Sequence, residues 1–359
     1  MSFQPEPAYR HGSASRTAVL LVNLGTPDAP TAVALRRYLA EFLSDPRVVE
    51  IPAIVWKPLL HGIILNVRPA KSAAKYASIW TPHGSPLAHW TRRQAEELQT
   101  RLGDEGLIVR HAMRYGNPSV ASVLDELKAE GVTRALVLPL YPQYAAATTA
   151  SALDAVMAWS AAQRRMPEWR FINRYHDDPG FIEALATRVR AHWAEHGRSP
   201  HLLLSFHGVP ERSLHLGDPY HCECHKTARL LRERLGMGSE EVSVTFQSRF
   251  GKAKWLEPYT EPSLIALARR GVERVDVMCP GFSADCLETL EDIAQEARDA
   301  YLDAGGKAFH YIPCLNDDPS WIDALEGLTR RHLQGWLPAT DDPERARQRE
   351  RALALGARD

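Results

Sequence analysis

Short apolar runs alternate with longer amphipathic segments along most of the chain. One such run, at 202–206, is largely apolar and ends at His207, after which a glycine and a proline interrupt the pattern. A run of this length predicts a short interior strand, whereas the amphipathic segments at 119–130 and 261–270 predict helices. Strands that alternate with helices are typical of βαβ units, so the pattern predicts parallel sheets flanked by helices.

Four segments of the first half have counterparts in the second half, in the same order. The pairs are LLVNLGTP from 20 with LLLSFHGVP from 202, MRYG from 113 with SRFG from 248, GVTRALVLP from 131 with GVERVDVMCP from 271, and HDDPGFIEAL from 176 with NDDPSWIDAL from 316. With Leu24 aligned to His207, the first pair is offset by 183 residues, and the second pair is offset by 135, so the first copy carries about 48 additional residues within 28–107. We expect two similar α/β domains, 1–198 and 199–359, with strand ends that meet at a shared cleft.

The most apolar stretch, 48–67, lies in this additional segment and is called the lip below. Lys57, His61 and Asn66 interrupt it, so it falls short of the roughly 20 apolar residues that span a bilayer. The pattern favours a helix half buried on its domain, or an exposed surface that touches lipid or a large flat apolar ligand. Trp56 and Leu60 are the residues whose replacement by polar ones would test lipid contact.

Composition and charge exclude several classes of protein. With 43 Lys and Arg against 44 Asp and Glu, the net charge of −1 gives no field that would attract nucleic acid. The polar, Pro-containing start of the chain has no apolar core of a signal peptide, and five cysteines fit reduced thiols, so we expect a cytoplasmic protein. We expect the start to be a disordered arm, and the charged tail 339–359 to be a solvated helix or a disordered end.

The two copies differ at a position where chemistry is expected, because His207 stands where the first copy has Leu24. Ligands of open α/β sheets bind beyond the carboxyl ends of the strands, and imidazole both binds metals and titrates near neutral pH. A turn histidine held by backbone partners is the alternative.

The segment 283–305 follows the strand VDVMCP and predicts an amphipathic helix. At about 100° per residue, its acids fall within an arc of roughly 80°; they are Asp285, Glu288, Asp292, Glu296 and Asp299. A solvated acidic face explains this pattern equally well. A carboxylate that converges with His207, however, would ligate a divalent metal or accept protons.

A third candidate is the sequence HCECH at 221–225. Its thiols and imidazoles are metal ligands, but Cys-x-Cys lacks the usual two- to four-residue gap and no second cysteine pair follows. The chain has no GxGxxG, GxxxxGK[ST] or GxSxG motif, so nucleotide hydrolysis and serine-esterase chemistry lack support.

The combination of LLVNLGTP, FLSDPRVV, GSPL, YPQY with TT after it, SFHGVP, GDPY, QSRFG with WLEP, and PGFSADCLETL resembles ferrochelatase, in order from about Val19 to Trp336. The resemblance implies a lyase of haem biosynthesis with two similar Rossmann-like chelatase domains. Such an enzyme inserts Fe(II) into protoporphyrin IX in the cleft between them.

The resemblance also implies site residues. His207 and Glu288 match the catalytic pair, and His207, Glu288, Asp292 and Glu296 match groups that bind the incoming metal. The residues that match the porphyrin pocket are Arg68, Tyr76, Ser85, Arg114, Tyr115, Trp255 and Phe282. The spacing from Tyr76 to Ser85 is two residues longer than the family pattern.

Departures from the family pattern limit what is carried over. Some members bind a [2Fe-2S] cluster, but here the last cysteine is Cys314 and Ala146 stands at the position of the loop thiol, so we expect no such cluster. Cys286 stands where other members carry histidine, so that histidine is not obligatory. The C-terminal extension of membrane-associated members is missing, so we expect at most peripheral membrane contact through the lip.

Several alternatives remain open at the level of sequence. Another tetrapyrrole chelatase, iron insertion into coproporphyrin, and a carrier that binds tetrapyrrole without reaction all share these features. The residues do not separate a proton acceptor from a metal ligand at His207 and Glu288. An upstream enzyme of the haem pathway is a further candidate partner.

Overall fold

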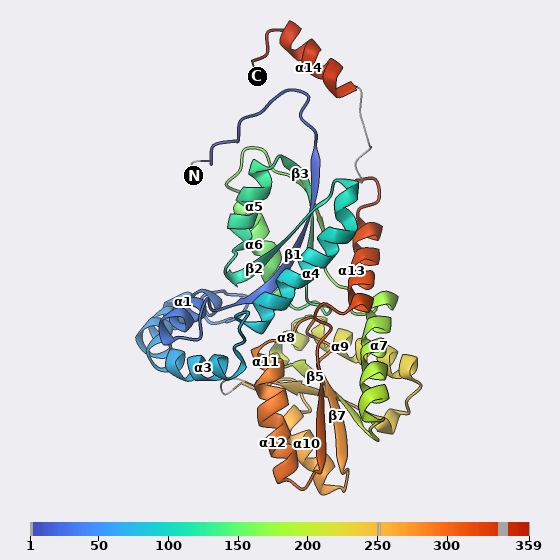
Figure 1. The fold of residues 1–359 in the computed structure, drawn as a ribbon. Helices are drawn as coiled ribbons and strands as arrows, with labels where there is room; N and C mark the ends of the chain where they lie inside the picture. The colour runs from blue at the N-terminus through green and yellow to red at the C-terminus, as the bar shows by residue number, and fades with distance from the viewer. Residues whose placement is uncertain (1–2, 250, 252, 337–343, 359) are drawn as a thin grey trace.

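Two four-stranded parallel sheets form the framework of the protein (Figure 1). The computed structural model describes residues 3–249, 251, 253–336 and 344–358. The first sheet has the order β2-β1-β3-β4, and its strands are β1 Arg16–Thr26, β2 Ile108–Gly116, β3 Val132–Pro139 and β4 Glu168–Phe171. The second has the order β6-β5-β7-β8, and its strands are β5 Leu202–His207, β6 Val242–Gln247, β7 Arg274–Met278 and β8 Ala308–Ile312.

The two sheets repeat one topology, which confirms the predicted α/β class and the duplication. Corresponding strands come from the matched segments of the sequence, so β1 is the counterpart of β5 and β3 that of β7. The predicted interior strand before His207 is present as β5, and its residues Leu202 to Phe206 are fully buried.

Helices flank both sheets, as the alternating pattern predicts. In the first half they are α1 Ala32–Phe42, α2 Ala53–Leu59, the π-helix η1 Leu60–Ile64, α3 Leu65–Ile79, α4 Pro86–Leu102, η2 Gly103–Glu105, α5 Val120–Ala129, η3 Ala146–Ala150, α6 Ser151–Ser160 and α7 Pro179–His196. In the second they are α8 Glu211–His215, α9 Tyr220–Leu235, η4 Ser239–Glu241, α10 Thr260–Arg269, α11 Leu287–Leu290, the π-helix η5 Asp292–Ala297, α12 Arg298–Asp303, α13 Pro319–His332 and α14 Glu344–Ala354.

The last long helix of each half packs against the other half. Helix α7 lies beside α9 and β8 of the second half, and α13 lies beside α4 of the first (Figure 1). Both helices start alike, because Asp178 and Asp318 each cap the N-terminus just before a proline. Residues of both halves therefore share one core, in which Leu21 of β1, Leu204 of β5 and Trp321 of α13 belong to the same cluster.

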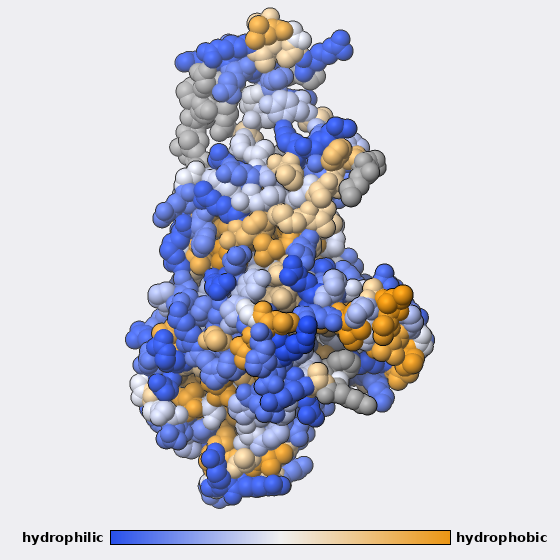
Figure 2. Space-filling view, turned by 180° about the vertical axis from the view of Figure 1, so that it is seen from behind, coloured by the Kyte–Doolittle hydropathy of each residue, from blue (hydrophilic) through white to orange (hydrophobic). Residues whose placement is uncertain are grey.

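Residues 28–107, within which the first copy has its additional residues, form α1, α2, η1, α3, α4 and η2. Within the lip, Trp56 and Leu60 point inward, since Trp56 is 7% exposed and Leu60 is fully buried, and the Trp56 indole donates a hydrogen bond to the Leu43 carbonyl over 2.6 Å. Because both are buried, Trp56 and Leu60 are not the residues whose replacement would test lipid contact. The outer apolar residues, which gather on one projecting face in Figure 2, are Ile51, Ile54, Val55, Leu59, Ile63 and Val67.

The two ends of the chain differ in structure. Residues 3–15 contain no helix or strand, but Glu6 pairs with Lys128 over 2.9 Å, so the expected arm is attached to the body. Of the charged tail, 344–354 forms α14, which matches the helical alternative, and 339–343 lies outside the described residues. Among the described residues, no helix is long and apolar enough to cross a bilayer.

Candidate active site

His207 ends β5 and pairs in register with Gln247 of β6. Its Nδ1 lies 2.6 Å from the carbonyl oxygen of Gly208. A carbonyl only accepts, so Nδ1 carries the proton and donates, which leaves the lone pair on Nε2. The rings of Trp255 and Phe282 flank the imidazole, each with its centroid 6.5 Å from that of His207. The structure thus brings together three of the predicted site residues around a nitrogen that can accept a proton or bind a metal.

The side-chain amide of Gln247 connects this strand end to Glu288. Its Nε2 donates to the backbone carbonyl of Glu288 over 2.6 Å, and its Oε1 accepts from Ser205 Oγ over 2.7 Å. The Gln247 carbonyl also accepts from the Gly208 N–H over 2.8 Å. Gln247 is buried, so these bonds fix the start of α11 against the end of β5.

The acidic helix is not a regular α-helix, and the predicted single face of five acids is wrong. A π-helix, η5, follows α11, and the Glu296 N–H reaches back five residues to the Glu291 carbonyl over 2.9 Å. The wider turn changes the angular position of each residue. Asp285 lies before α11, where it is buried and accepts from Tyr311 Oη over 2.5 Å and from Asn316 Nδ2 over 2.7 Å.

The π-helix instead gathers Glu291, Asp292 and Glu296, whose carboxylate oxygens all lie within 4.8 Å of one another. Lys75 of α3 reaches them from the other half, with Nζ 2.7 Å from Glu291, 2.9 Å from Glu296 and 3.8 Å from Asp292. Burial acts to lower the Lys75 pKa, but hydrogen bonds to Glu291 and Glu296 outweigh it and raise the pKa. Lys75 therefore stays charged and joins α3 to the acids.

Asp292 connects this acidic cluster to the strand ends. Ser248 Oγ donates to its Oδ2 over 2.6 Å, and Ser248 holds a φ of 62°, which few residues other than glycine adopt. Burial raises the pKa of Asp292, and the charge of Glu288 raises it further. The predicted pair of Glu288 and Asp292 therefore lies close enough for one carboxylate to disfavour ionisation of the other.

Three predicted porphyrin residues come from the additional segment. Tyr76 of α3 is buried; burial raises the pKa of its phenol and the nearby Glu288 carboxylate adds to this, so the structure brings Tyr76 and Glu288 together across the two halves. Ser85 is buried at the start of α4 and accepts from Thr26 Oγ1 over 2.8 Å, at the end of β1. Arg68 lies on the exposed side of α3.

Arg114 and Tyr115 of β2 are held in a buried network. Asp45 Oδ2 accepts from Arg114 Nη2 over 2.6 Å, from the Tyr115 hydroxyl over 2.8 Å and from Ser151 Oγ over 2.6 Å. The Tyr115 ring packs in the same apolar cluster as Tyr76. The structure thus packs Tyr115 in one cluster with Tyr76, and the polar groups of Arg114 and Tyr115 are already bonded to Asp45.

Sequence reasoning missed several residues that hold the site. Gln247 and Ser248 lie within QSRFG and Asp45 within FLSDPRVV, so these motifs contained the signal, whereas nothing in the sequence pointed to Lys75 and Glu291.

The HCECH candidate is not a metal cluster in the described residues. It lies at the start of α9, where Cys224 is buried in the core and Glu223 is bonded to Arg174 over 2.6 Å and to the Tyr144 N–H over 2.7 Å.

The family model for ferrochelatase matches residues 16–333 of this chain. The chain belongs to the ferrochelatase family. Ferrochelatases insert iron into protoporphyrin to make haem, and the chain is accordingly a lyase of haem biosynthesis.

Curated relatives match along nearly the whole chain. The ferrochelatase of Methylibium petroleiphilum is 68% identical over 361 residues and covers 99% of each chain. That of Polaromonas sp. is 66% identical over 365 residues, 99% of this chain and 100% of the relative, and that of Azoarcus sp. is 63% identical over 358 residues, 99% of each.

A comparison with solved structures supports the fold. SirB from Bacillus subtilis with Fe³⁺ has a TM-score of 0.51 at 13% identity and covers 90% of this chain and 98% of its own. DR2241 from Deinococcus radiodurans, described as similar to chelatases, has a TM-score of 0.50 at 14% identity and covers 92% and 57%. At these identities the likeness shows the fold alone.

The Asp45 network gives a prediction on stability and its dependence on pH. Burial acts to raise the Asp45 pKa, but hydrogen bonds from Ser151, the Arg47 N–H and Tyr115 lower it overall, as does Arg114. Asp45→Asn is expected to lower the free energy of unfolding by about 2–3 kcal/mol at pH 7, because it removes the charged partner of the partly buried Arg114. A lowered folded-state pKa gives stability that is complete above the unfolded value of about 3.9 and is lost as the pH falls through the folded value.

Urea unfolding at pH 7 and pH 3 checks this prediction, with Asp154→Asn as a control. Asp154 pairs with Arg47 over 2.7 Å at the surface, so its loss is expected to cost under about 1 kcal/mol. The deficit of the Asp45 variant should shrink at pH 3. An equal deficit at both pH values would contradict the role of the ionised carboxylate.

Proposed function

We propose that the chain inserts Fe(II) into protoporphyrin IX at the strand end occupied by His207, with Glu288 as the facing carboxylate. The observation that carries this proposal is the bond of Nδ1 to the Gly208 carbonyl, which leaves Nε2 free. The Gln247 amide, bonded to the Glu288 carbonyl over 2.6 Å, supports it because it sets the position of one group relative to the other.

The reaction exchanges two pyrrole protons for one ferrous ion, so charge balances when both protons leave the porphyrin. His207 accepts one pyrrole proton at Nε2 as a general base, and the acids that begin with Glu288 accept the other. Glu288 supplies the negative charge that attracts Fe(II) and stabilises the protonated imidazole. A metal ligand role for His207 is the alternative, and it uses the same lone pair.

Binding must also bend the macrocycle, since a planar porphyrin shields its nitrogens. Trp255 and Phe282 offer apolar faces beside His207, and contacts with them would supply the binding energy for distortion. Among the described residues the Trp255 indole N–H is buried without a partner, so it is available to a polar edge of a ligand.

The remaining predicted pocket residues take two roles in this proposal. Tyr76, Ser85 and Arg68 of the additional segment contact the outer part of the porphyrin. Arg114 and Tyr115 act from behind, because their bonds to Asp45 hold the wall against which Tyr76 packs.

Iron reaches the site along the acids of the π-helix. Glu296 lies at the surface, Asp292 is largely buried, and Glu288 follows on α11. The Lys75 ammonium neutralises Glu291 and Glu296 in the outer part of this path, so an incoming cation must displace it. Fe(II) enters as substrate, and the proposal needs no resident cofactor or iron–sulfur cluster.

The lip contributes a membrane contact in a cytoplasmic protein. Its outer residues Ile54, Val55 and Ile63 are 86%, 61% and 58% exposed, and they lie on one projecting face (Figure 2). A contiguous apolar surface of this kind fits the interface of a bilayer, from which an apolar porphyrin would be taken up.

His207→Ala is expected to lower the rate of iron insertion by about 10²- to 10⁴-fold, the usual contribution of a general base. Protoporphyrin binding should stay within about threefold of wild type, because Trp255 and Phe282 remain. Anaerobic loss of free-porphyrin fluorescence with Fe(II) measures the rate, and quenching without iron measures binding. His332→Ala, on α13, serves as the control. Retained multiple turnover in the His207 variant would overturn the assignment.

Ile54→Ser with Ile63→Ser is expected to reduce co-sedimentation with liposomes that contain anionic lipid at least threefold, since two exposed apolar side chains are lost. Val33→Ser, an exposed apolar residue of α1 outside the lip, is the control and should sediment as wild type does. Equal sedimentation of the lip variant and the wild type would remove the lip from membrane contact.

A further inference from the structure

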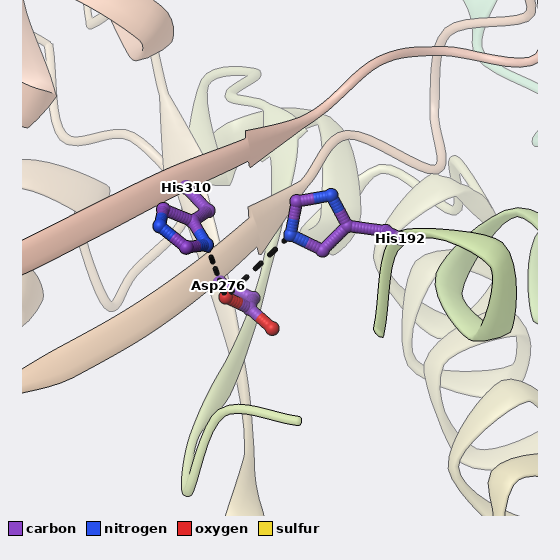
Figure 3. A group of neighbouring side chains, drawn as sticks. All are labelled: His192, Asp276 and His310. Atoms are coloured by element: carbon purple, nitrogen blue, oxygen red, sulfur yellow. Dashed lines mark ion pairs between the residues drawn. The ribbon is translucent and has the colours of Figure 1, made fainter. Parts of the chain in front are cut away.

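His192, Asp276 and His310 meet at the far end of the second sheet from His207 (Figure 3). His192 lies on α7, Asp276 in the middle of β7, and His310 in β8, where it pairs in register with Asp276. The Asp276 Oδ1 lies 3.8 Å from His192 Nε2 and 3.6 Å from His310 Nδ1. Three potential metal ligands from three elements therefore converge on one point.

The buried carboxylate of Asp276 is incompletely bonded. Its side chain is 0% exposed, and its Oδ2 accepts from the indole N–H of Trp193 over 2.8 Å. Among the described residues, Asp276 Oδ1 and His192 Nε2 are both buried without a hydrogen-bond partner. Unbonded buried polar atoms are costly, so a group that satisfies both atoms at once is expected between them.

Arg274 does not supply the missing hydrogen bonds of Asp276 Oδ1 and His192 Nε2. Its guanidinium donates to the carbonyls of His196, over 2.8 Å, and Gly197, over 2.5 Å, at the end of α7. Its Nη2 donates to His310 Nδ1 over 3.1 Å and forms an ion pair with Asp276 Oδ1 at 3.6 Å, a distance too long for a hydrogen bond, so Oδ1 has none among the described residues. The Arg274 side chain is partly exposed, so it has room to withdraw from His310 while it keeps its contacts with α7.

The spacing of the three ligand atoms suits a shared ion. Ligands about 2.0–2.2 Å from a tetrahedral zinc ion lie roughly 3.3 Å apart. The two distances from Asp276 Oδ1 are 3.6 and 3.8 Å, and all three ligand atoms lie within 4.8 Å of one another, so the side chains must converge to hold an ion. The Trp193 bond to Oδ2 orients the carboxylate from behind, as outer hydrogen bonds of metal ligands do.

We propose that His192, Asp276 and His310 bind one divalent transition-metal ion of the zinc class, at a site separate from iron insertion. Asp276 pairs with Leu202 at the start of β5, whereas His207 is at its end, about 17 Å away along the strand. Water or His196, whose ring centroid is 4.6 Å from that of His192, completes the coordination.

The site has a structural role. Helix α7 comes from the first half and packs on the second sheet. An ion bound by residues of α7, β7 and β8 therefore stabilises the packing of this helix on that sheet. Metal that binds the folded state stabilises it by mass action.

Equilibrium dialysis of the metal-free full chain against Zn²⁺, without porphyrin, tests the proposal. The variant Asp276→Asn keeps an oxygen for Trp193 but loses the anionic ligand, so it should bind one Zn²⁺ per chain less than wild type by elemental mass spectrometry. Saturating Zn²⁺ should raise the midpoint of thermal unfolding by ~3 °C or more in wild type and by less in the variant. His332→Ala should behave as wild type.

A second variant, His310→Gln at the partly exposed edge strand β8, covers the case in which Asp276→Asn does not fold. Both variants should keep iron insertion within about twofold of wild type, which separates this site from the catalytic one. The same Zn²⁺ stoichiometry in wild type and in a folded variant would overturn the proposal. Equal stabilisation of the wild type and of that variant by Zn²⁺ would also overturn it.

Discussion

The geometry of the candidate active site depends on the buried side chain of Gln247. Its amide accepts from Ser205 in β5 and donates to the Glu288 carbonyl at the start of the acidic helix, over 2.7 and 2.6 Å. Its own carbonyl fixes the Gly208 N–H just after His207. A single residue at the end of β6 therefore ties the backbone just after His207 to the backbone of Glu288, and the next residue, Ser248, holds the Asp292 carboxylate.

The two halves repeat one topology, but only the second carries an imidazole at the end of its first strand. The strand ends of both halves are equivalent in topology, but the first presents Leu24, which packs beside Phe282 and Leu287 of the second half. The additional segment then supplies Tyr76 and Lys75 from α3 toward the acids of the other copy. Because α7 and α13 are exchanged, the two halves share a core, which fixes these groups relative to one another.

Much of the framework was predictable because strand length and turn residues depend on local sequence. The run before His207, the four repeated segments and the lip were all placed by such patterns, and the interior strands appear at the expected positions. The family of the chain was also predictable, from ordered motifs. The roles of individual site residues, including those of His207 and Glu288, stay predictions.

The failures have physical causes. A wheel at 100° per residue assumes α-helical hydrogen bonds, so it could not place Glu291 where a π-helix follows. It also assumed a helix from residue 283, whereas Asp285 lies before the start of α11. In the lip, an apolar run does not reveal which residues face the body, and Trp56 turned out to bond the Leu43 carbonyl. In the sequence, nothing distinguishes Asp276 from other strand residues, because only the fold brings His192 and His310 close to it.

The central claim is that protoporphyrin binds at the strand end where His207 and Glu288 meet. A crystal structure of the protein with metal-free protoporphyrin IX tests it most directly. The account predicts a macrocycle against Trp255 and Phe282, with a pyrrole nitrogen within hydrogen-bonding reach (~3 Å) of His207 Nε2 or the Glu288 carboxylate. A porphyrin bound elsewhere, or one whose nitrogens lie beyond the reach of both groups, would contradict it.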